Sequence, residues 1–218
     1  MHQLLTFIAD NQEQILRLLG QHVEFSVLSV VLSILIAVPL GLLCRASRIL
    51  AQILLNAVSL IYTIPTLALF GLMIPLLGIG WVPAVAAIVL YSLLPIAQNT
   101  YTGLLAVPLD AREAARGMGM SAAQILLRVE LPLALSLIFA GIRVAAVNAV
   151  GMVTIASFIG AGGLGDLIFR GISTVSTVVV VTGSVPVLVM AIGADILLRR
   201  VERALALRMG EQLPEAGA

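Results

Sequence analysis

The chain has 218 residues, of which 61% are hydrophobic and 11% are charged, with a net charge of +1. Soluble domains carry roughly 25% charged residues, so this composition excludes an ordinary soluble protein and indicates an integral membrane protein. Long apolar runs without strict alternation favour membrane-spanning helices over a β-barrel. The single cysteine, Cys44, excludes an internal disulfide.

Residues 1–24 form the first segment, in which charged side chains are mixed with leucine and isoleucine. Such a mixture predicts an amphipathic helix that lies at the membrane interface. The segment lacks the basic start of a signal peptide, so we expect it to be retained. A transmembrane domain over residues 25–198 and a cytoplasmic tail over residues 199–218 complete the predicted organisation.

Predominantly apolar runs long enough to span a bilayer predict five transmembrane helices. They cover residues 25–44, 52–76, 82–105, 132–158 and 178–198, with an external segment at 159–177. Pro65, Pro75 and Pro95 interrupt the second and third helices, and we interpret them as packing irregularities rather than bending points. The predicted fold class is therefore an all-α integral membrane protein.

The predicted orientation of the chain in the membrane follows from its arginines. The chain has no lysine, so arginine supplies every basic side chain apart from histidine. Those expected on one side of the membrane are Arg45, Arg48, Arg112, Arg116, Arg128, Arg199, Arg200, Arg203 and Arg208. Only Arg17 and Arg170 fall on the other side. Because cytoplasmic segments carry an excess of positive charge, we expect the N-terminus outside and the C-terminus in the cytoplasm.

Residues 107–132 form a polar loop between two strongly apolar regions. Asp110 is the expected N-cap of a first helix, with Glu113 at capping-box spacing. The Gly117-Met118-Gly119 step is expected to end that helix, because glycine tolerates positive φ. Ser121 is expected to cap a second short helix, and Pro132 suits the first turn of the next span. The pattern predicts a helix, a tight turn and a helix on the cytoplasmic face.

The spacing of this loop resembles the "EAA" loop of ABC importer permeases. The matching residues are Glu113, Ala114, Ala115, Gly119, Val129, Leu131 and Pro132. Val129 stands where the family usually has isoleucine. The alternative, from composition alone, is an ordinary capped amphipathic hairpin on the membrane surface.

The resemblance implies a type I ABC importer permease fold, similar to that of methionine importers. It implies that the loop docks in a groove of a separate ATPase subunit, which would bind ATP and magnesium. The partners it implies are a second permease subunit, identical or related, two ATP-binding subunits, an extracytoplasmic substrate-binding protein and the lipid bilayer. We expect no nucleic-acid partner, and we expect the protein in the plasma (inner) membrane as a multi-pass subunit.

No motif for catalysis occurs in the sequence: it has no HExxH, no CxxC, no P-loop and no Ser/His/Asp constellation. We therefore expect no catalytic residue, and any ATP must be bound by another chain. His2 and His22 lie far from any acidic cluster, so no metal site is expected either.

Polar side chains inside the fourth predicted span are the candidates for a role in the membrane. Arg143 lies eleven residues beyond Pro132, roughly 16 Å into the helix, where a charge usually faces protein or water. It could contact a substrate carboxylate, or it could tie the helix to carbonyls or to a second subunit. Asn148 has the same alternatives. Asp195 and Arg199 have the spacing of an ion pair on one helix face.

A glycine-rich run follows the fourth span, with Gly160, Gly162, Gly163 and Gly165 in it. The run matches G-x-G-x-x-G, but it has no βαβ context, so a turn is favoured over a nucleotide site. The surrounding ASFIGAGGLGDLIF resembles the segment of osmoprotectant and methionine permeases that faces the substrate-binding protein or lines the external gate.

Three further stretches resemble permeases for glycine betaine, carnitine and choline of the OpuB/OpuC type: IPTLALFGLMIPLLGIG, YSLLPIAQNTYTGL and AGIRVAAVNAVG. The aromatic residues are few and scattered, so we expect no tight cage for a quaternary ammonium group. The resemblance implies an osmoprotectant permease. A methionine-type or other small-molecule permease is the first alternative, and a channel or secondary carrier is the second.

Overall fold

The computed structural model describes residues 2–208, and within that range the chain is helical. The α-helices are α1 (His2–Asp10), α2 (Gln12–Cys44), α3 (Arg48–Thr63), α4 (Thr66–Leu77), α5 (Trp81–Ala106), α6 (Leu109–Gly117), α7 (Ala122–Ile125), α8 (Leu131–Ala156), α9 (Gly165–Ser173) and α10 (Thr177–Arg208). A π-helical turn at Leu126–Glu130 joins α7 to α8, and a 3₁₀ turn at Ser157–Ile159 follows α8.

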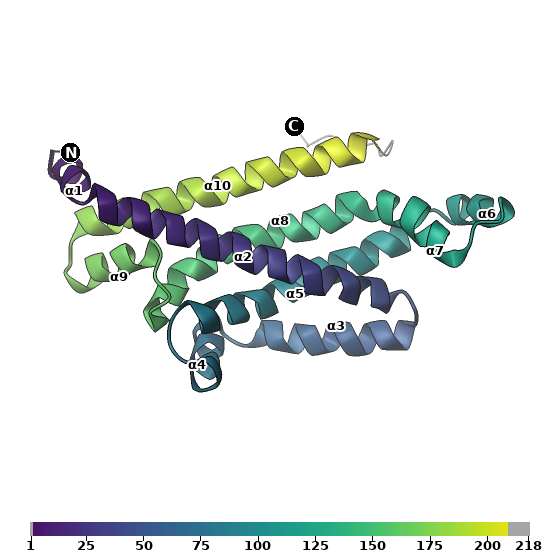
Figure 1. Ribbon diagram of the computed structural model, residues 1–218, viewed down its shortest axis with the longest axis horizontal. Helices are drawn as coiled ribbons and strands as arrows, with labels where there is room; N and C mark the ends of the chain where they lie inside the picture. The colour runs from purple at the N-terminus through teal and green to yellow at the C-terminus, as the bar shows by residue number, and fades with distance from the viewer. Residues whose placement is uncertain (1, 209–218) are drawn as a thin grey trace.

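The long helices lie side by side along the molecule (Figure 1). Helix α5 packs against both α2 and α8, α3 and α4 pack against α5, and α10 covers α8. One apolar core joins α2, α3, α4, α5 and α8. A smaller cluster of Leu18, Leu164, Leu167 and Val179 joins α2, α9 and α10.

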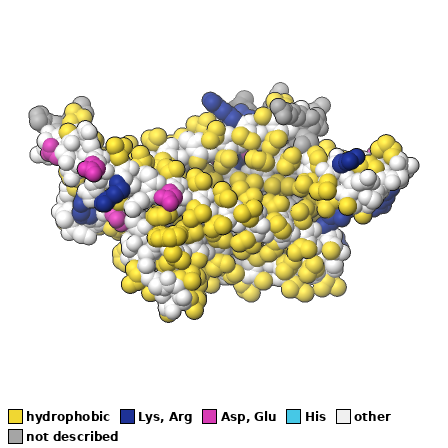
Figure 2. Space-filling view, viewed as in Figure 1, with side chains coloured by type: hydrophobic (Ala, Val, Ile, Leu, Met, Phe, Trp, Pro, Cys, Tyr) yellow, Lys and Arg dark blue, Asp and Glu magenta, His cyan; other side chains and the backbone are white. Residues whose placement is uncertain are grey.

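Four helices of the described chain are long and apolar enough to cross a membrane, and the bent pair α3–α4 makes a fifth candidate span. Figure 2 shows a broad face of hydrophobic side chains, with charged side chains at the two ends of the molecule and a further basic group at its upper edge. The predicted all-α membrane fold is confirmed.

Pro65 breaks the second predicted span, contrary to its interpretation as a packing irregularity. Helix α3 ends at Thr63, Ile64 is extended, and α4 leaves at 99° to α3. The residue before a proline is pushed out of the α region, which accounts for the break. Pro75 and Pro95 lie inside α4 and α5.

Two helix boundaries differ from the expected ones. Helix α2 begins at Gln12, so the chain does not break at residue 24, and α10 continues past residue 198 to Arg208. Composition marks where the hydrocarbon layer ends, whereas a helix continues into water as long as its residues favour helix. Residues 209–218 of the predicted tail lie outside the described residues.

Candidate coupling loop and translocation face

The first helix of the predicted loop is α6, and its N-cap is Pro108 rather than Asp110. The expected cap at Asp110 is wrong because Pro108, at φ −56° and ψ 138°, already ends the extended connection and the helix begins directly after it. Asp110 lies in the first turn of α6, where a carboxylate favours the positive end of the helix dipole.

The end of α6 has the geometry of a Schellman motif. The N–H of Gly119 donates to the carbonyl of Arg116 at 2.9 Å, and the N–H of Met120 donates to the carbonyl of Ala115 at 3.1 Å. Gly119 has a φ of +78°, the left-handed conformation that this motif requires. The predicted end of the helix at this glycine step is confirmed.

The second half of the loop begins with a capping box at Ser121. Its hydroxyl accepts from the N–H of Gln124 at 3.3 Å, and its own N–H donates to the Gln124 side chain at 2.8 Å. The predicted cap is confirmed, and Pro132 lies in the first turn of α8 as expected. However, the second helix is not separate, because α7 runs through the π-helical turn into α8 as one continuous element.

The matching loop residues divide between a buried side and an exposed side of the loop. Ala115 is 1% exposed and anchors α6, whereas Glu113, Ala114 and Gly119 are exposed. Val129, Leu131 and Pro132 are half-buried where α8 begins. The surface around α6 also exposes three large apolar side chains, Leu109, Met118 and Leu127.

Glu130 is a structural residue of the loop that the sequence reasoning did not single out. Its carboxylate is 2% exposed, and Arg45 places two guanidinium nitrogens 2.7 and 2.9 Å from its two oxygens. The Nε of Arg112 lies 3.2 Å from the same carboxylate, and Arg112 also donates to the Leu104 carbonyl. The cluster ties the end of α2, helix α6 and the start of α8 together.

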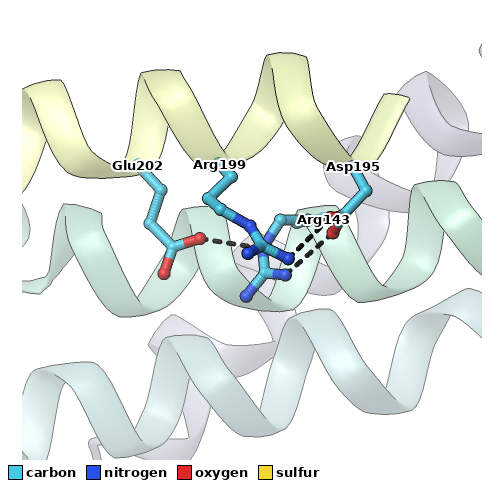
Figure 3. A network of polar contacts seen from close by, with 4 residues as sticks. All are labelled: Arg143, Asp195, Arg199 and Glu202. Atoms are coloured by element: carbon cyan, nitrogen blue, oxygen red, sulfur yellow. Dashed lines mark hydrogen bonds and ion pairs between the residues drawn. The ribbon is translucent and has the colours of Figure 1, made fainter. Parts of the chain in front are cut away.

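Arg143 points from α8 towards α10 and lies between two carboxylates (Figure 3). Its Nη1 is 2.9 Å from Asp195 and its Nε is 2.9 Å from Glu202. Arg199 lies 2.7 Å from the second oxygen of Asp195, so the predicted Asp195–Arg199 pair is present. The expected contacts of Arg143 did not include these two acids of its own chain, and its role in a substrate pathway or at a subunit interface stays a prediction.

Asn148 lies on another face of α8 and is exposed. It lines a cavity together with Tyr62 of α3 and Tyr91 of α5. A second cavity lies between the N-terminal half of α3 and the C-terminal half of α5. Its polar lining residues are Arg48, Gln52, Asn56, Ser59, Gln98 and Tyr101. Polar side chains in a membrane span face protein or water, so this α3–α5–α8 surface is the candidate translocation face.

The glycine run is an ordered turn held by α2. Gly160, Gly162 and Gly163 have φ values of +77°, +86° and +85°. Gln21 accepts from the N–H of Gly163, and the Nδ1 of buried His22 accepts from the N–H of Leu164, both at 3.3 Å.

Further contacts fix both sides of this turn. The Nε2 of His22 lies 3.0 Å from the Val150 carbonyl, so the ring spans from α8 to the turn. A Cβ at Gly165 would overlap the Thr154 carbonyl oxygen, which explains why glycine begins α9. Burial raises the pKa of the Asp166 carboxyl next to it, and the charges of Arg170 and Arg17 partly offset this effect.

These features define a class: a polytopic helical membrane subunit with an ordered polar loop at one end and a polar face along its spans. Residues 29–207 match the family model described as "binding-protein-dependent transport system inner membrane component". The chain belongs to this family of ABC transporter permeases, which are multi-pass inner-membrane proteins and are not themselves the ATPase.

Curated relatives match over nearly the whole chain. The osmoprotectant import permease protein OsmW of Salmonella typhimurium is 46% identical over 90% of this chain and 94% of its own length. The glycine betaine/carnitine/choline transport system permease protein OpuCB of Bacillus subtilis is 41% identical over 93% and 94%. The carnitine transport permease protein OpuCB of Listeria monocytogenes is 38% identical over the full length of both.

Solved structures show the same fold at lower identity. The inward-facing MetNI methionine ABC transporter aligns with a TM-score of 0.80 at 24% identity, covering 88% of this chain and 95% of that chain. An amino acid ABC transporter crystallised with histidines aligns with a TM-score of 0.77 at 20% identity, covering 91% and 97%. The predicted similarity to the methionine-importer permease fold is confirmed.

Proposed function

We propose that this chain is the permease subunit of an ABC importer for small quaternary ammonium osmoprotectants, of the chemical class of glycine betaine, carnitine and choline. The main support for the importer mechanism is the α6 loop. The Schellman motif and the capping box hold this loop in one conformation, in which Glu113 and Ala114 are exposed. Exposed apolar side chains beside a membrane-proximal loop are typical of a protein-docking surface. The names of the relatives supply the substrate class.

The finer assembly is part of the same proposal. Two permease chains, identical or related, enclose the pathway between their α3–α5–α8 surfaces, and two ATPase subunits bind the α6 loops. The Gly160–Gly165 turn, at the opposite end of the molecule from α6 (Figure 1), faces an extracytoplasmic binding protein. Residues 1–24, 25–198 and 199–218 then serve as outer interfacial segment, permease domain and cytoplasmic tail.

The proposed cycle follows from this placement. ATP and magnesium bind only in the partner subunits, whose closure draws the two α6 loops together. Each loop is continuous with α8, so the spans around the pathway move with it. The pathway opens outwards, accepts substrate from the binding protein, and returns to the inward-facing state after hydrolysis.

The test is uptake of labelled glycine betaine, carnitine, choline and methionine by cells with and without this gene, at low and high osmolarity. We expect deletion to abolish uptake of at least one quaternary ammonium compound and to leave methionine uptake unchanged. Loss of methionine uptake alone would contradict the substrate class and leave the importer mechanism standing. Uptake that persists without ATP would contradict the importer mechanism itself.

A further inference from the structure

Two tyrosines from different helices meet at the outer half of the translocation face. Tyr62, near the end of α3, and Tyr91, in the middle of α5, have ring centroids 5.4 Å apart and ring planes tilted by 55°. They form one corner of a cavity of about 380 Å³ between α3, α4, α5 and α8. That volume is in the range of small-molecule sites.

The rest of the cavity lining is mostly apolar, with three polar but uncharged side chains. Thr66, Ser92 and Asn148 supply hydroxyl and amide groups, and every lining residue is without formal charge. Arg143 is directed away from this face towards α10 and its two carboxylates. A cation entering the cavity therefore meets neither a repelling guanidinium nor a carboxylate that would hold it tightly.

We propose that Tyr62 and Tyr91 form a transit site for a quaternary ammonium group, with Asn148 and Thr66 binding the polar end of the same molecule. A cation is attracted to an aromatic face within about 6 Å of its centroid. Because the two ring centroids are only 5.4 Å apart, one ammonium group beside the pair can lie within that distance of both. This inference rests on the proposed function, and it names residues of the permease that would contact the substrate.

The exposure of the cavity suits a low-affinity site on the transport pathway better than a high-affinity binding site. Tyr62 is 39% exposed, so the bound group stays partly hydrated and its affinity stays low. The second cavity, between α3 and α5, has Asn56 and Gln98 as uncharged polar groups and Arg48 as its one charged lining residue. The expectation of no tight aromatic cage stays a prediction. Tyr62 and Tyr91 are the aromatic pair that lines this cavity, and they form a corner of it and not a closed cage.

The first test measures occupancy of the site in the assembled complex with its ATPase. A reporter cysteine, Ile155→Cys, lines the cavity, and Cys44→Ala removes the native thiol. We expect choline to slow the labelling of this cysteine by a water-soluble maleimide at least threefold. The neutral analogue of choline, in which carbon replaces the ammonium nitrogen, should give no protection at the same concentration. Phe158→Cys, which is exposed and does not line this cavity, serves as the control.

The second test removes the rings. In the reporter background, Tyr62→Leu and Tyr91→Leu should each weaken apparent choline affinity about fivefold, whereas Tyr62→Phe and Tyr91→Phe should keep it within twofold, because the phenyl face remains. Two results would overturn the site. One is that the neutral analogue protects the reporter cysteine as well as choline does, and the other is that choline protects it equally well in the leucine variants and in the parent. Loss of choline uptake is not required for this readout. A complex that transports choline without such protection contradicts the site alone, and one that transports only methionine contradicts the proposed function.

Discussion

Single side chains decide how the docking loop is attached to the membrane helices. Glu130 is almost completely buried, and its carboxylate is shared between Arg45 and Arg112, which are 35% and 19% exposed. A buried charge is tolerated when it is paired, and removing its partner leaves an uncompensated charge. The three residues come from the end of α2, from α6 and from the start of α8, so their ion pairs fix the loop relative to two spans.

Replacing the arginine should therefore harm the protein more than replacing the acid. Arg45→Gln leaves the buried Glu130 carboxylate with Arg112 alone, and we expect a loss of about 3 kcal/mol of stability. Glu130→Gln leaves two arginines that reach water, and about 1 kcal/mol is expected. The measurement is thermal unfolding of the purified complex in detergent. The double variant, Arg45→Gln with Glu130→Gln, should lose less stability than the sum of the two single losses. Strictly additive losses would argue against the Arg45–Glu130 ion pair.

Apart from the N-cap of α6, the sequence predicted the loop features that depend on neighbouring residues. The end of α6 at Gly119 and the cap at Ser121 each follow from residues at most five positions away, so local chemistry determines them. The Glu130–Arg45 pair joins residues 85 positions apart. No spacing rule connects them, and only the folded arrangement reveals the contact.

At the scale of helices, close packing around α5 holds the spans together. Gly41 of α2 lies against Thr100 of α5, and Gly141 of α8 lies against Pro95 and Asn99 of α5. In a bilayer, helices associate by van der Waals packing, so small residues that let backbones approach are the main attachment points. The sequence located these helices by their apolar length. It did not reveal which glycines are contacts, since that depends on helix rotation.

A methyl group at Gly41 should separate α2 from α5. An added Cβ would lie 2.5 Å from the Thr100 Cβ and 2.8 Å from the Ala97 carbonyl oxygen, so Gly41→Ala should destabilise the protein by about 1–3 kcal/mol. Gly20→Ala on the same helix is the matched control, because nothing lies within 4 Å of its added Cβ. Thermal unfolding of both variants provides the comparison. A Gly41→Ala protein as stable as the Gly20→Ala protein would show that α2 and α5 do not pack this closely.

For the whole molecule, one continuous helical element connects the polar loop at one end with the glycine turn at the other. The element from Ala122 to Ile159 has 38 residues, with the docking loop before it and the glycine turn after it. Its length is about 57 Å at 1.5 Å per residue, more than a bilayer core requires. Displacement of the α6 loop therefore reaches the outer turn through one rigid element, with the π-helical turn at Leu126–Glu130 as its only irregular step before α8.

If the α6 loop couples the permease to the ATPase as proposed, the conformation of Gly119 should control that coupling. Its φ of +78° is strained for any residue with a Cβ, and most for a β-branched one, although no atom lies within 4 Å of an added Cβ. Gly119→Val should cost about 2 kcal/mol in the loop, turn α6 away from its docked position and lower ATP-driven uptake at least tenfold. The chain should still reach the membrane, because the spans are untouched.

Gly119→Asn is the matched control: asparagine adopts the left-handed region more readily and should recover most of the uptake. Uptake and ATP hydrolysis measured together in vesicles separate coupling from assembly, and a Gly119→Val protein as well coupled as the asparagine variant would remove this loop from the mechanism.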